Sequence, residues 1–152
     1  MSHNGPVSDA QDWARRRRDA AAAQGDRLAR ARAVETERAR ELILGFVAEA
    51  HRRGVTPGPL LARAGDAKAT ARTGLVGWYL KRDGSLGVTT DGSYYLLVRP
   101  LPLKARLLGV TLQPTDPPLQ VGAGGRDGES IALDQLLAMR LDAGDDWPVH
   151  RG

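Results

Sequence analysis

Hydrophobic residues in the stretch 39–50 recur with the spacing of one helical face. The spacing is i, i+3, i+4, i+7, i+8 and i+11, and the residues are Ala39, Leu42, Ile43, Phe46, Val47 and Ala50. Cations at 51–53 followed by Gly54 are typical of a helix C-terminus, and Pro57 prevents the helix from continuing. The pattern predicts a helix that ends near residue 53 and buries this face.

The same helix is expected to reach back to Trp13, but without an apolar stripe. The segment 13–34 is rich in Ala and Arg and contains no Pro, which favours helix. Leu28 is its main large aliphatic residue, and Gly25 costs about 1 kcal/mol relative to alanine inside a helix. We therefore predict a helical arm over 13–34, preceded by a disordered segment over 1–12.

The stretch 73–99 alternates as a β-ribbon that is apolar on both faces. Asp83-Gly84 and Asp91-Gly92 each separate two extended runs, and Asp-Gly is typical of a two-residue type I′ hairpin turn. Two-residue loops would place Val88 opposite both Tyr79 and Tyr95. One predicted face then carries Leu75, Tyr79, Leu86, Val88, Tyr95 and Leu97, and the other carries Val76, Trp78, Leu80, Thr89, Tyr94, Leu96 and Val98.

Because one helix covers only one face of this ribbon, the rest of the chain is expected to cover the other. Segments 106–114 and 118–122 are predicted as further strands, and Ser130 as the N-cap of a helix over 131–141. The Pro- and Gly-punctuated stretch 55–72 is predicted as a loop.

The predicted fold is therefore a single α+β domain over 35–144. A long N-terminal helix packs on a four- to five-stranded antiparallel meander or half-barrel, and a short C-terminal helix completes it. The segment 145–152 is expected to be a disordered acidic tail, with Trp147 either exposed or acting as a clasp.

Composition excludes several classes of chemistry. The chain has 152 residues and no Cys, which rules out disulfides, thiolate metal sites and a Cys nucleophile. No apolar run approaches the ~20 residues of a membrane span, and the N-terminus lacks the apolar core of a signal peptide. We therefore expect a cytoplasmic protein with no membrane partner.

The formal net charge of +4 is unevenly distributed. The middle of the chain, residues 54–110, carries eight Lys or Arg against three acids, whereas residues 111–152 carry three against seven. This asymmetry favours either an anionic partner or attraction between the two ends of one fold.

Residues suited to catalysis are sparse, so we predict no enzyme and no catalytic residue. His3 and His150 lie near the chain ends, His51 lies at a helix C-terminus, and no Ser has a nucleophile-elbow pattern. The glycine-rich stretch 121–130 matches neither the dinucleotide fingerprint nor the P-loop, and the acids at 142–146 lack calcium-loop spacing. No cofactor or metal is expected.

The sequence contains more residues suited to binding than to catalysis. Four consecutive arginines, Arg15 to Arg18, point around most of the predicted helix, where they either grip phosphates or an acidic protein surface or are simply solvated beside acidic neighbours. Trp78 and Tyr94 with nearby cations resemble a base-stacking platform, although core packing is the simpler interpretation. The candidate binding residues are Arg15, Arg16, Arg17, Arg18, Arg27, Arg30, Trp78, Lys81, Arg82, Tyr94 and Arg99.

The stretches 73–98 and 116–144 together resemble an uncharacterised family of small proteins from GC-rich bacteria. The resemblance spans about residues 36–144, and it implies no activity and no binding residue. We accordingly expect a non-catalytic interaction or accessory protein, whose partner is another protein or a second copy of the chain. A nucleic-acid or ribosome-associated binder is the alternative, and a small-molecule enzyme ranks third.

Overall fold

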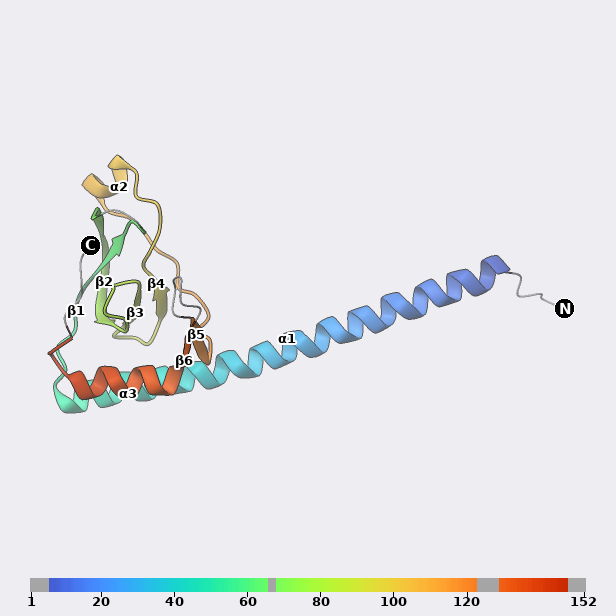
Figure 1. Ribbon diagram of the computed structural model, residues 1–152, viewed down its shortest axis with the longest axis horizontal. Helices are drawn as coiled ribbons and strands as arrows, with labels where there is room; N and C mark the ends of the chain where they lie inside the picture. Colours follow the sequence, from blue (N-terminus) through green and yellow to red (C-terminus); the bar gives the residue numbers. More distant parts are fainter. Residues whose placement is uncertain (1–5, 66–67, 123–128, 148–152) are drawn as a thin grey trace. The chain divides into compact units, whose positions relative to one another are not determined.

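A computed structural model describes residues 6–65, 68–122 and 129–147 (Figure 1). The chain divides into two compact units at the Glu35–Thr36 boundary, which lies within the first helix. The helices are α1 (Pro6–Arg53), α2 (Leu103–Leu108) and α3 (Leu133–Ala143), and the strands are β1 (Gly58–Arg63), β2 (Thr70–Tyr79), β3 (Leu86–Thr89), β4 (Tyr94–Leu96), β5 (Gln120–Gly122) and β6 (Ser130–Ala132).

The predicted α+β class is confirmed. The unit from Thr36 onward contains a four-stranded antiparallel sheet in the order β1-β2-β3-β4, and β5 and β6 form a separate two-stranded pair. Helix α1 begins at Pro6, inside the segment 1–12 that we expected to be disordered.

The prediction of a loop over 55–72 was wrong. This stretch contains β1 and the first residues of β2, which pair from Arg63↔Thr70 to Gly58↔Gly77. Proline is tolerated in β1 because β1 is an edge strand. A register shift after Leu60 is accommodated by Gly74, whose φ of 74° few other residues adopt.

The predicted hairpin register was off by one residue. Val88 pairs with Trp78 and Tyr94, not with Tyr79 and Tyr95. Both Asp-Gly turns have positive φ at the glycine alone, 74° at Gly84 and 89° at Gly92, whereas a type I′ turn requires it at both residues. Each loop is a type I turn closed by a glycine, one residue longer than we assumed, and the shift moves Leu86 and Val88 to the opposite face.

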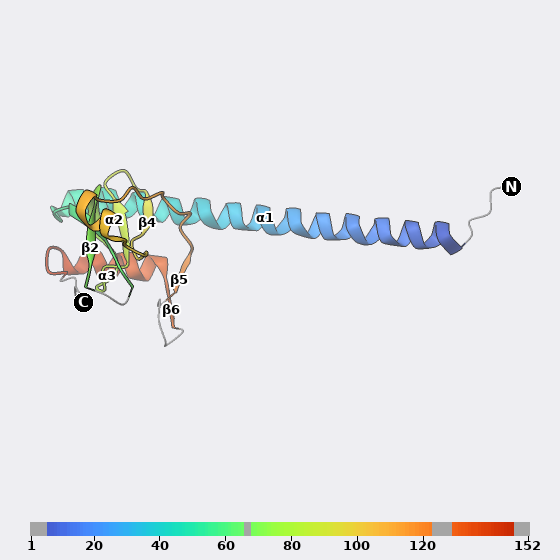
Figure 2. The same ribbon diagram turned by 90° about the horizontal axis from the view of Figure 1, so that it is seen from above.

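Each face of the sheet carries its own core, as the sequence predicted. One cluster joins Trp78, Leu80, Leu86, Val88 and Tyr94 to the second half of α1 and to α3. Figures 1 and 2 show these two helices running beside each other along the sheet. The other cluster contains Leu60, Ala62, Ala64, Ala71, Tyr95, Leu97, Leu101 and Leu112.

The sheet curls so that its two edges meet at one end. The Arg63 amide donates to the Leu97 carbonyl at 2.8 Å, and the Arg99 amide donates to the Arg63 carbonyl at 2.9 Å. The end of β1 therefore lies beside the chain that follows β4, in the manner of a half-barrel, while the rest of the β4 edge lies apart from β1.

The C-terminal third differs from the prediction in two places. Residues 103–108 form helix α2, which overlaps the strand that we expected over 106–114, and Ser130 lies in β6 instead of capping α3, which begins at Leu133. Trp147 acts as a clasp: the guanidinium carbons of Arg82 and Arg140 lie 4.5 and 5.4 Å from its ring centroid. Residues 148–152 of the expected tail, and 123–128 of the glycine-rich stretch, lie outside the described residues.

Candidate interaction surfaces

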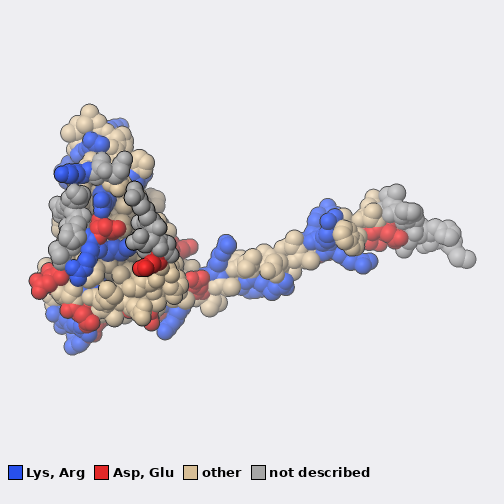
Figure 3. Space-filling model, in the orientation of Figure 1, with Lys and Arg blue, Asp and Glu red and all other residues tan. Residues whose placement is uncertain are grey.

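The first part of α1 is a helix without a buried face. No side chain between Ser8 and Arg38 is buried, and burial begins at Ala39. Trp13 and Val34 are 59% and 71% exposed. Residues 13–34, the arm, contain seven Arg against two Asp, and Figure 3 shows basic side chains gathered along this part of the helix.

Several arginines of the arm have no partner among the residues that the structure describes. Arg15 pairs with Asp12 at 2.6 Å, and the Arg17 guanidinium lies 4.1 Å from the Trp13 ring centroid. Arg27 donates to Gln24 at 2.8 Å. Within the described residues, no hydrogen bond or ion pair engages the side chains of the other four, which are Arg16, Arg18, Arg30 and Arg32.

Trp78, a candidate stacking residue, belongs to the core. It is 1% exposed, its indole Nε1 donates to the Val55 carbonyl at 3.1 Å, and its ring meets Phe46 edge to face at a centroid distance of 5.6 Å. Tyr94 is 4% exposed, and burial raises its pKa to about 12. These two aromatic rings therefore offer no open face to a nucleic-acid base.

The predicted cations of the sheet region are not gathered into one patch. Arg82 stacks on Trp147, and the Lys81 ammonium donates to the Gly122 carbonyl at 3.2 Å. Arg99 is exposed beyond the end of β4. Two of the candidate residues, Lys81 and Tyr94, line a common cavity.

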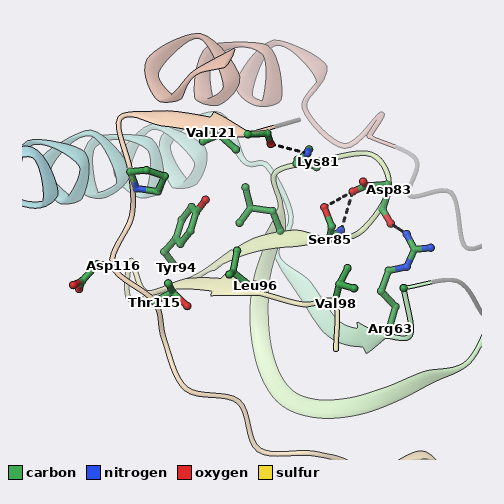
Figure 4. A pocket seen from close by; sticks show the side chains of 14 residues that line it. Arg63, Lys81, Asp83, Ser85, Tyr94, Leu96, Val98, Thr115, Asp116 and Val121 are labelled. Carbon is green, nitrogen blue, oxygen red and sulfur yellow. Dashed lines mark hydrogen bonds between the residues drawn. The ribbon is translucent and has the colours of Figure 1, made fainter. Parts of the chain in front are cut away.

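That cavity is a cleft of about 720 Å³ beside the open edge of β4 (Figure 4). Residues from the hairpin loop 81–85 between β2 and β3 line one end of the cleft, and residues from the segment 115–118 that leads into β5 line the opposite end. The lining residues are Arg63, Gly65, Lys81, Asp83, Ser85, Leu86, Tyr94, Leu96, Val98, Thr115, Asp116, Pro118, Val121 and Gly122.

The described residues at one end of the cleft include two cations and one carboxylate. Ser85 donates to Asp83 Oδ1 from its hydroxyl at 2.6 Å and from its amide at 2.9 Å. Burial works to raise the pKa of Asp83, but these hydrogen bonds and the charges of Lys81 and Arg63 outweigh it and hold the pKa below its ordinary value. Arg63 and Lys81 both donate to backbone carbonyls, and among the described residues neither forms a salt bridge.

The floor of the cleft is apolar and includes exposed backbone. The side chains of Leu96 and Val98 are 55% and 42% exposed. The Leu86 carbonyl accepts a hydrogen bond from the amide of Leu80, which follows β2, so Leu86 directs its backbone polar groups away from β4. In such a pair the partner residue does the same, and Leu96 therefore directs its N–H and C=O away from β3. Neither group has a hydrogen-bond partner among the residues that the structure describes.

Described residues cover the neighbouring part of this edge. The Thr115 amide donates to the Tyr94 carbonyl at 2.8 Å, and at the far end of the cleft Arg40 binds Asp116 at 2.7 Å. Sequence reasoning missed the cleft because Arg63 lay in a predicted loop. A search of that stretch for an edge strand containing proline would have indicated β1, although not the cleft itself.

Comparison of the chain with protein-family models, curated proteins and solved structures found no match. Among the described residues, no three His, Asp or Glu side chains form a group that would hold a metal ion. In the same residues, no helix is both long and apolar enough to cross a bilayer.

Proposed function

We propose that the protein is a non-catalytic interaction protein that docks on a macromolecule with an acidic surface through its N-terminal arm. The observation that carries this proposal is the absence of any buried side chain in α1 between Ser8 and Arg38. A helix in water draws most of its stability from packing an apolar face, and no side chain of this stretch is buried among the described residues. A partner would supply the missing contacts.

The charge of the arm supports an acidic partner. Seven Arg against two Asp in residues 13–34 give a formal charge of 7 − 2 = +5. Guanidinium groups bind carboxylates and phosphates bidentately. Arg16 and Arg18, which have no partner within the described part of the chain, could bind such groups without breaking an ion pair seen there.

Site-specific photocrosslinking in cells of the source organism tests the proposal. A benzophenone amino acid replaces Ala21 in the arm or, as a control position, Met139 on the exposed side of α3. We expect the arm position alone to crosslink one protein species. The crosslink should weaken in R16Q/R18Q and persist in the charge-matched control K68Q/K104Q, whose lysines are exposed in the other unit.

Two other outcomes decide against a protein partner. Crosslinks to RNA or DNA would identify the alternative, a nucleic-acid binder, and the affinity should then fall with salt more steeply in the native chain than in R16Q/R18Q. If the arm position yields no crosslink while the α3 position does, docking through the arm is contradicted.

A further inference from the structure

We propose that the cleft beside β4 binds a short extended peptide segment in which an apolar side chain and an acidic side chain are two residues apart. This proposal goes beyond docking through the arm. It rests on a different surface, which lies wholly within the second unit.

The open backbone at Leu96 calls for an extended ligand. An extended peptide pairs with an exposed sheet edge by exchanging N–H···O bonds, and Leu96 offers one donor and one acceptor to a single residue of such a peptide. The adjacent Tyr94 carbonyl is already bound by Thr115. The opening therefore suits a short segment, whereas the edge of a second copy of the sheet would need several consecutive free residues.

The side chains of the cleft specify what the segment carries. Side chains on one face of an extended peptide recur every second residue. Leu86, Leu96, Val98 and Val121 form an apolar surface for one of them (Figure 4). The next side chain on that face would reach the end of the cleft where Arg63 and Lys81 lie.

Charge complementarity makes that second side chain a carboxylate. Among the residues that the structure describes at this end, the cations Arg63 and Lys81 outnumber the single carboxylate Asp83. Each cation retains N–H donors beyond the one that binds a backbone carbonyl. The Asp83 carboxylate accepts two hydrogen bonds from Ser85 and stays ionised. It would therefore repel a doubly charged phosphate group on the ligand more strongly than a singly charged carboxylate.

Selection from a random heptapeptide display library on the full-length protein tests the proposal. We expect enrichment of peptides with an aliphatic and an acidic residue two positions apart. Synthetic peptides that differ only in this acidic residue then test the charge: replacing Glu by Lys should lower affinity at least tenfold, about the effect of losing one charged hydrogen bond.

Protein variants locate the binding. K81E and L96D should each abolish enrichment, whereas K104E, at an exposed position on α2 outside the cleft, should retain it. Unchanged melting temperatures would show that the variants fold. Methylation of the peptide nitrogen opposite Leu96 should lower affinity, and bound peptide should slow hydrogen exchange of the Leu96 amide.

The contrary results are equally definite. The proposal is overturned if the enriched peptides lack an acidic residue or if K81E enriches them equally well. It is also overturned if no peptide is enriched above background. Sedimentation showing a native dimer that L96D dissociates would identify a second copy as the occupant. These experiments test the cleft and not docking through the arm. The arm is tested separately by R16Q/R18Q, a variant that leaves every residue of the cleft unchanged.

Discussion

The two parts of α1 are stabilised by different interactions, although both belong to the helix Pro6–Arg53. From Ser8 to Arg38 no side chain is buried, and the stretch is rich in residues with high helix propensity. The part from Ala39 to Arg53 buries Ala39, Ile43, Phe46, Val47 and Ala50 against the sheet and α3. Helix in the first part depends on propensity and local ion pairs, whereas in the second part tertiary packing imposes it. A helix assignment alone therefore does not reveal what stabilises the segment.

The largest expected effect is on the core that holds the second part of α1. Trp78→Ala should lower the free energy of unfolding by about 3–5 kcal/mol, because it opens a cavity against Phe46 and leaves the Val55 carbonyl without its donor. Denaturant unfolding monitored by circular dichroism measures the loss. A normal unfolding midpoint in this variant would contradict the placement of Trp78 in the core.

Two aliphatic truncations in the same helix compare its parts directly. Ile43 is fully buried, whereas Leu28 is 49% exposed. Ile43→Ala should destabilise the protein by about 2–5 kcal/mol, and Leu28→Ala should change its stability by less than about 0.5 kcal/mol. Equal losses in matched denaturation curves would mean that the arm is packed in solution.

Gly25 offers a smaller change confined to the arm. No neighbouring atom lies within 4 Å of an added Cβ, so Gly25→Ala should favour local helix by about 1 kcal/mol. We expect a stronger helical signal at 222 nm with no change in the cooperative melting of the domain. A shift in that melting temperature would show that the arm and the domain unfold together.

The smallest effect concerns the C-terminal end of α1. Hydrogen bonds from Arg52 and Arg53 lower the pKa of Glu49 to about 2, so ionised Glu49 stabilises the fold above its unfolded pKa of about 4.5. That contribution should fade as the pH falls from about 4.5 toward 2. In Glu49→Gln, the difference in melting temperature from the native protein should shrink over the same interval. A constant difference would contradict the shifted pKa.

Local pattern predicted most of the fold, and its errors have specific causes. The helical face from Ala39 to Ala50, the three strands of the ribbon and a core on each face all followed from residue spacing. Strand β1 was missed because Pro59 and the nearby glycines resemble a loop, and only its edge position makes proline acceptable. Helix α2 was missed because the short apolar run that ends at Gly109 is compatible with a helix as well as with a strand.

The candidate surfaces divide in the same way. The arginines of the arm were evident from the sequence, and the structure adds which of them have internal partners. The cleft was not predictable, because it brings together Arg63, Lys81 and Leu96 from three segments. Its geometry also depends on a hairpin register that differs by one residue from the one that Asp-Gly suggests.

By itself the sequence determined that the helical face from Ala39 to Ala50 would be buried, because hydrophobic periodicity is a local property of the chain. It also determined the charge of the arm and the absence of cysteine chemistry. Only the tertiary structure decided the register of the sheet, the burial of Trp78 and the open edge at Leu96. These depend on turn geometry and on contacts between distant segments, which the free energy of the whole fold selects from several locally acceptable arrangements.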